Sequence, residues 1–145
     1  MNTKHKQGTV SELVAASHFV QNGYKVSLPV DGFGEYDMII DDSKLYRVQV
    51  KTIYWDKSKS RYLISCVTSH FRGNGRRENK KYINDCFDLM CGVSVEHQRI
   101  YLIPFENVAG RRSITVYPTG KPKTVNTRYD DFEQYAEQLL SLAGR

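Results

Sequence analysis

The chain has 145 residues, of which 40% are hydrophobic and 12% aromatic, and its formal net charge is +5. This length and composition predict one folded domain spanning residues 1–145 and argue against a disordered chain. No apolar stretch is long enough to cross a bilayer and the N-terminus has no signal-peptide core, so we expect a cytoplasmic protein with no membrane partner.

The first predicted element is a helix that begins at a capping box, Thr9-x-x-Glu12. Gly23 predicts its C-terminal end, because glycine readily adopts the left-handed conformation found there. The residues expected on its buried face share helical spacing: Val10, Leu13, Val14, Ser17 and Val20.

Short strands and turns follow the helix. Alternating or apolar runs predict strands at Lys25–Leu28, Tyr36–Ile40, Leu45–Tyr54, Arg61–Thr68, Cys86–Val93 and Arg99–Phe105. The basic, glycine-containing stretch 69–81 predicts an exposed loop, with a short helix at about Glu78–Asp85. A final amphipathic helix is expected from Asp130 or Asp131 to about Ala143. The fold class is therefore a single α/β domain ordered α-β-β-β-α-β-β-α.

Basic residues concentrate in two segments. Lys57–Lys81 contains eight basic residues and one acid, and Arg111–Arg128 contains five basic residues and no acid. Concentrated positive charge attracts a polyanion, because each neutralised phosphate releases condensed counterions. We therefore expect DNA as the partner, bound by these candidate residues: Lys57, Lys59, Arg61, His70, Arg72, Arg76, Arg77, Lys80, Lys81, Arg111, Arg112, Lys121 and Lys123.

Four polar residues near the predicted hairpin suggest phosphodiester chemistry. Asp37 begins one strand, while Gln49 and Lys51 share one face of the next. Magnesium prefers oxygen ligands, which Asp37, Gln49 and the Val50 carbonyl offer. The Lys51 ammonium is suited to orienting water or stabilising a pentavalent phosphate. Glu12 joins this set if the first helix packs beside the hairpin.

"YD" followed on the next strand by "VQVK" resembles the signature of the PD-(D/E)xK nuclease superfamily. The resemblance implies a restriction-endonuclease-like core, α-β-β-β-α-β, with a mixed central sheet flanked by helices and an added C-terminal helix. Two positions depart from the pattern: Tyr36 replaces the proline, and Gln49 replaces the acid before x-Lys. Gln-x-Lys is similar to the motif of bacterial group I intron homing endonucleases, and the resemblance covers roughly Gly8 to Val108.

The resemblance implies a magnesium-dependent, site-specific double-stranded DNA endonuclease, with Mn²⁺ as a substitute metal. Asp37 would be the main metal ligand, and Gln49 a second ligand or a metal-positioning residue. Lys51 would be the catalytic lysine and Glu12 the helix carboxylate. A homodimer or homotetramer would suit a long or symmetric target.

Alternatives remain open at this point. Each site residue also has an interpretation without chemistry. Glu12 would then only cap its helix, Asp37 would face water, and Gln49 and Lys51 would lie on the solvated face of an edge strand. A Holliday junction resolvase, a restriction or repair enzyme of the same core, and an inactive DNA-binding module are the rival functions.

Overall fold

The computed structural model describes residues 3–32, 34–41, 43–71 and 77–118 of the chain, with the backbone alone for residues 69–71 and 77–79. The elements, in chain order, are α1 (Thr3–Gln21), β1 (Lys25–Ser27), β2 (Met38–Asp41), β3 (Leu45–Thr52), β4 (Tyr54–Asp56), β5 (Arg61–Ser65), β6 (Val67–Phe71), β7 (Arg77–Lys81), β8 (Leu89–Ser94), β9 (Arg99–Pro104), α2 (Phe105–Val108) and β10 (Ser113–Val116). Within these residues, no helix is long and apolar enough to cross a membrane.

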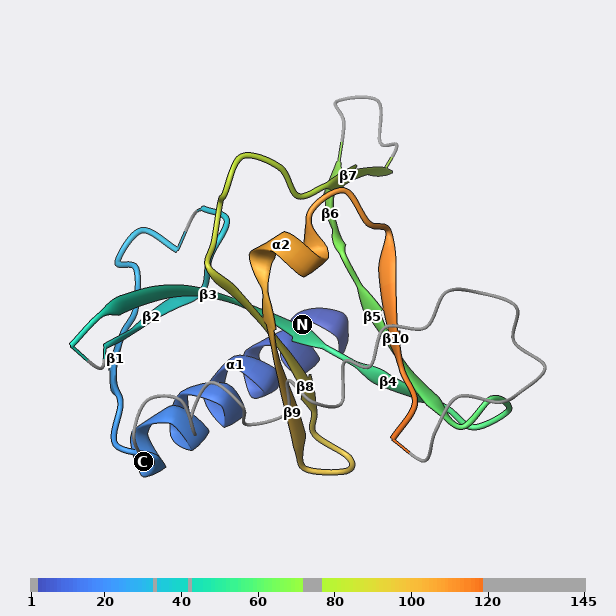
Figure 1. Cartoon of the computed structure of the whole chain (residues 1–145), viewed down its shortest axis with the longest axis horizontal. Coiled ribbons are helices and arrows are strands. Elements are labelled where there is room, and N and C mark those ends of the chain that lie inside the picture. Colours follow the sequence, from blue (N-terminus) through green and yellow to red (C-terminus); the bar gives the residue numbers. More distant parts are fainter. Residues whose placement is uncertain (1–2, 33, 42, 72–76, 119–145) are drawn as a thin grey trace.

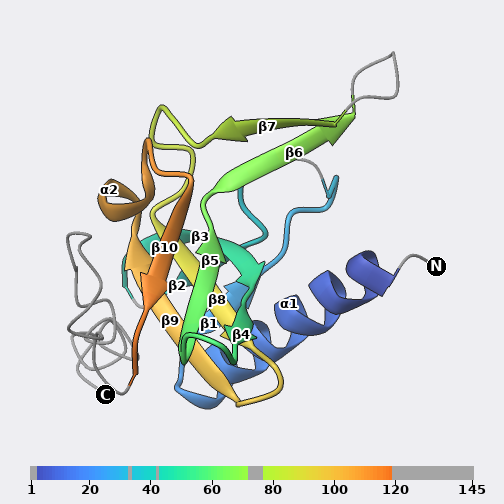
Figure 2. The ribbon, with the colours of Figure 1, turned by 90° about the vertical axis from the view of Figure 1, so that its right-hand side faces the viewer.

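A mixed five-stranded sheet forms the centre of the fold, in the order β1-β2-β3-β8-β9. Strand β3 pairs with β2 antiparallel and with β8 parallel. Helix α1 lies along one face of this sheet, and a smaller sheet, β10-β5-β4, lies across the other (Figures 1 and 2). The predicted α/β class with a mixed central sheet is confirmed.

The hydrophobic core is divided between the two faces of the central sheet. On the α1 side, Ala15 and Phe19 pack with Val48 and Val50 of β3. On the other side, buried side chains from β5, β8, β9 and β10 form the second cluster, which includes Tyr62. The alternation of β3 is as predicted, because Val48 and Val50 are buried and Gln49 is half-buried.

Helix α1 differs from its prediction in its start and its buried face. The helix begins at Thr3, so Thr9 lies inside it and its hydroxyl donates a hydrogen bond of 3.1 Å to the His5 carbonyl instead of capping. The buried residues are Ser11, Ala15 and Phe19, whereas Leu13 of the predicted face is 65% exposed. Two of the three buried residues, Ser11 and Ala15, are small and one of them is polar, so hydrophobic spacing does not reveal this face. The predicted stop at Gly23 is confirmed by its φ of 88°.

The connection from β3 to β8 also differs from its prediction. The expected helix at 78–85 is wrong, because β7 pairs with β6 to form a two-stranded ribbon that projects from the body (Figure 2). The strand predicted at 61–68 is divided at Cys66 into β5 and β6, and the predicted loop at 69–81 lies partly in the ribbon. Strand β10 was not expected and pairs with β5. The predicted C-terminal helix lies outside the described residues.

Candidate active site

The candidate site begins where β2 and β3 separate. Met38 pairs with Val48, so Asp37, one residue earlier, lies opposite Gln49 just beyond the ladder. The Asp37 backbone N–H donates to the Val48 carbonyl at 2.8 Å, and its carboxylate accepts the Val50 N–H at 2.8 Å. These two bonds fix the Asp37 carboxylate against the middle of β3.

Glu12 of α1 reaches the Asp37 carboxylate. The two side chains share a hydrogen bond, and partial burial together with the Asp37 charge raises the pKa of Glu12 to about 7. Burial also raises the pKa of Asp37, although the Val50 N–H, the contact with Glu12 and the Lys51 charge act in the opposite direction. Two carboxyl groups in contact repel each other when both are ionised, so this pair is suited to a cation.

Lys51 projects to the face of the sheet opposite α1. Its ammonium donates a hydrogen bond of 2.9 Å to the Val67 carbonyl of β6 and lies 5.4 Å from the ring centre of Tyr82. Burial lowers the pKa of Lys51, while the nearby Asp37 carboxylate raises it. The ammonium is therefore partly desolvated and held by two contacts that the sequence pattern did not indicate.

Gln49 and Val50, next to the Asp37 carboxylate on β3, carry further oxygen atoms. The side-chain amide of Gln49 lies beside the Val50 carbonyl, with 3.5 Å between Gln49 Nε2 and the carbonyl oxygen. Within the described residues, no three His, Cys, Asp or Glu side chains cluster as a metal site. The residues at this place thus offer oxygen atoms from two carboxyls, an amide and a carbonyl, which is the ligand type that a hard cation such as Mg²⁺ prefers.

A contact between α1 and β3 sets the position of Glu12. The hydroxyls of Ser11 and Thr52 lie 2.6 Å apart, and Ser11 is fully buried. Because Ser11 directly precedes Glu12, this bond fixes the helix turn that carries the carboxylate. Sequence reasoning missed Ser11, whose only signal is a polar residue on the small-residue face of the helix.

The predicted DNA-binding residues are spread over several elements. Lys57 and Lys59 are exposed in the turn between β4 and β5, Lys80 and Lys81 are exposed in β7, and Arg111 and Arg112 are exposed before β10. His70 lies in β6 and Arg77 in β7, the two strands of the ribbon. Four candidates lie outside the described residues: Arg72, Arg76, Lys121 and Lys123.

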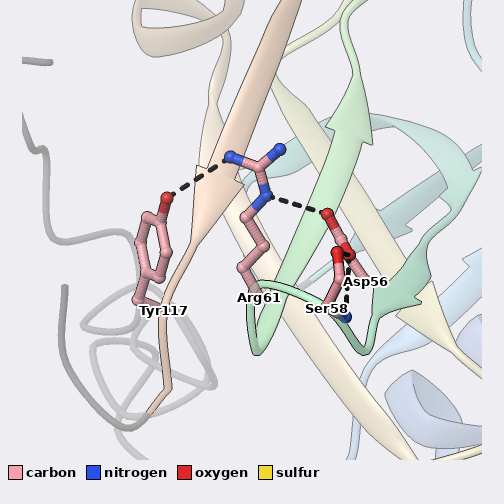
Figure 3. A network of polar contacts seen from close by, with 4 residues as sticks. All are labelled: Asp56, Ser58, Arg61 and Tyr117. Atoms are coloured by element: carbon pink, nitrogen blue, oxygen red, sulfur yellow. Dashed lines mark hydrogen bonds and ion pairs between the residues drawn. The ribbon is translucent and has the colours of Figure 1, made fainter. Parts of the chain in front are cut away.

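Arg61 has protein partners (Figure 3). Its guanidinium donates hydrogen bonds of 3.3 Å to the Asp56 carboxylate and 3.3 Å to the Tyr117 hydroxyl. Asp56 also accepts bonds from the hydroxyl and N–H of Ser58, at 2.6 and 3.1 Å. Arg61 thus joins the β4–β5 turn to the end of β10, which leaves less of its donor capacity for a phosphate.

Comparisons with known proteins identify the family of this chain and its fold. The chain is 28% identical to Protein 5.3 of Escherichia phage T7 over 117 residues, which cover 80% of this chain and 92% of that protein. The structure of the bacterial homing endonuclease I-Ssp6803I is similar, with a TM-score of 0.78 at 16% identity, covering 99% of this chain and 95% of that one. At that identity the likeness shows the fold alone. A family model described as PD-(D/E)XK endonuclease matches residues 1–137, and the chain belongs to this endonuclease family.

Proposed function

We propose that the chain is a magnesium-dependent endonuclease that hydrolyses phosphodiester bonds of double-stranded DNA at specific sites. The single observation that carries this proposal is the contact between the Glu12 and Asp37 carboxyls beside the Lys51 ammonium. Membership of the endonuclease family and the basic surface residues support it. Site-specific cutting is proposed by analogy with the homing endonuclease that has a similar fold.

Asp37, Glu12, the Gln49 amide oxygen and the Val50 carbonyl would hold Mg²⁺, with Mn²⁺ as a substitute. When bound, the metal neutralises phosphate charge and lowers the pKa of coordinated water. Asp37 is kept in place by the Val48 carbonyl and the Val50 N–H. Bound metal would hold both carboxyls in the ionised form, because a cation favours that form and replaces their shared proton.

Lys51 would act on the phosphate. Its ammonium is fixed by the Val67 carbonyl, and low exposure to water strengthens its attraction for negative charge that develops on the phosphoryl oxygens. The protonated form is the one that stabilises this charge, so the Asp37 carboxylate, which favours protonation of Lys51, supports catalysis indirectly.

Exposed cations would bind the DNA backbone, and we propose a homodimer or homotetramer, since one chain of this size covers a short length of duplex. The cations proposed to contact phosphates are exposed at the surface: Lys57, Lys59, Lys80, Lys81, Arg111 and Arg112.

The test uses supercoiled plasmid, a mixed-sequence duplex pool and a synthetic four-way junction, each with magnesium or chelator. Cutting should require the metal, and Glu12→Gln, Asp37→Asn and Lys51→Ala should each reduce the rate by about 10²-fold or more. Glu106→Gln, which changes an exposed carboxylate of α2, is the control.

Each outcome selects a function. Preference for one duplex site supports the site-specific enzyme, and preference for the junction indicates a resolvase instead. Binding without cutting on all substrates, unaffected by chelator, would indicate a DNA-binding module. A Glu12→Gln variant as active as the wild type would refute the proposed role of the carboxyl pair.

A further inference from the structure

A groove of about 440 Å³ lies between β7 and the segment before β10, and it is lined by Val67, Lys80, Lys81, Ile83 and Arg112. Its three cationic side chains are exposed and have no hydrogen-bond or ion-pair partner within the described residues. Ile83 is also exposed, at 62% of its surface. Cations beside apolar surface match a DNA backbone, in which charged phosphates alternate with deoxyribose.

The groove is joined to Lys51 by direct contacts. Val67, which lines the groove, accepts the Lys51 hydrogen bond at 2.9 Å through its carbonyl. Lys81 pairs with Val67 across the ribbon. On the groove's other side, the Arg112 carbonyl accepts the N–H of Cys66 at 2.9 Å, directly before Val67.

Tyr82 makes a second connection. It directly follows Lys81, is buried, and places its ring 5.4 Å from the Lys51 ammonium. Movement of β7 would therefore change both contacts that hold Lys51. The other exposed lysines, such as Lys25 in β1 and Lys44 before β3, have no such connection.

We propose that this groove holds one DNA backbone phosphate close to the scissile one, and that the bound phosphate keeps Lys51 in its position through Val67 and Tyr82. The inference rests on the proposed nuclease function. In this proposal, Lys80, Lys81 and Arg112 contribute to the rate of cutting as well as to the affinity for DNA. They fix the ribbon whose carbonyl holds the catalytic lysine, so they are positioning residues for the reaction.

The experiment measures single-turnover cutting with protein in saturating excess over the substrate that the wild type cuts fastest. Lys80→Ala/Lys81→Ala and Arg112→Ala should lower this rate about tenfold even at saturation, and Lys80→Arg/Lys81→Arg should restore it. The matched control, Lys25→Ala/Lys44→Ala, removes the same charge elsewhere and should cut at the wild-type rate.

A second measurement locates the phosphate. Single methylphosphonates are placed at successive positions around the cut. One flanking position should slow the wild type but leave Lys80→Ala/Lys81→Ala unaffected, because the groove variant does not bind that phosphate. The proposal would be overturned if the groove variants cut at the wild-type rate at saturation. It would also be overturned if the effects of the lysine substitutions and of the methylphosphonate were fully additive at every position.

Failure of the nuclease proposal itself is distinguishable. A wild type that cuts no substrate with metal refutes the nuclease, and the groove is then tested by binding of a fluorescent 30-base-pair duplex. In that case the slope of log affinity against log salt concentration is compared between variants. Lys80→Ala/Lys81→Ala should make this slope shallower by about one for each phosphate that it leaves without a cation. Lys25→Ala/Lys44→Ala should leave the slope unchanged. Equal slopes for both variants would overturn the phosphate site.

Discussion

Replacing Glu12 by glutamine should stabilise the metal-free protein while it slows cutting by about 10²-fold or more. In the folded protein, burial and the Asp37 charge raise the pKa of Glu12 from 4.5 to about 7. Folding therefore favours the protonated carboxyl, and the wild type loses stability as the pH rises from about 4.5 to about 7. Above pH 7 the penalty is complete. Glutamine carries no charge and avoids it.

The magnitude follows from the pKa change and the exposure of the side chain. At about 1.4 kcal/mol per pH unit, a fully buried group shifted from 4.5 to about 7 would cost roughly 3 kcal/mol. Glu12 is an exposed residue, so water screens much of this repulsion. We expect Glu12→Gln to raise the unfolding free energy by about 1 kcal/mol at pH 8, which corresponds to about 3 °C in Tm.

Thermal unfolding in chelator, followed by circular dichroism at pH 5 and pH 8, measures this effect. The difference between the wild type and Glu12→Gln should be largest at pH 8 and small at pH 5, and Glu106→Gln should show no such pH dependence. Adding Mg²⁺ at ten times its Kd should stabilise the wild type by about 1.4 kcal/mol and the variant by less. If Glu12→Gln is no more stable than the wild type at pH 8, the repulsion between the two carboxyls is refuted.

Three other substitutions test the surroundings of the site. Gln49→Glu should lower the Mg²⁺ concentration needed for half-maximal cutting several-fold, because it adds a carboxylate to the ligand set. The rate is measured against Mg²⁺ concentration, and an unchanged half-maximal concentration would contradict the assigned ligand role. Ser11→Ala removes the hydroxyl that contacts Thr52, so it should lower the unfolding free energy by about 1 kcal/mol and slow cutting. Thermal unfolding and the single-turnover rate measure these effects, with Ser17→Ala on the exposed side of α1 as the control. Gly92→Ala should destabilise the protein by about 1–3 kcal/mol, because its Cβ would lie 3.1 Å from Ile53 Cγ2, and unchanged thermal stability would show that the neighbouring side chains yield without cost.

Much of the site was predictable because its residues lie on adjacent strands. Two apolar alternating runs separated by a short turn predict a hairpin, and the alternation places Gln49 and Lys51 on one face. Glu12 was harder to place, because its contact with Asp37 depends on how the helix packs. Hydrophobic spacing indicated the wrong face of α1, since the buried contact uses Ser11 and Ala15.

The partners of Lys51 could not be predicted from sequence. The stretch before Tyr82 is polar and rich in residues that favour helices, yet it forms β7 because pairing with β6 outweighs local propensity. Strand β10 did carry a signal, the β-branched run Ile114–Val116, which the prediction overlooked. Long-range pairing decides both elements, and a single sequence does not contain that information in local form.

The parallel pairing of β3 with β8 has a consequence for synthesis on the ribosome. The two strands are separated by 36 residues, 53–88, so β3 acquires its second neighbour only after β8 has been made. Until then, the strand that carries Gln49 and Lys51 is an open edge, and the ribbon that supplies the Val67 carbonyl has no fixed place against it. A nascent or truncated chain would thus contain the carboxyl-bearing helix and hairpin without an assembled site. The order of translation itself would delay nuclease activity until most of the domain exists.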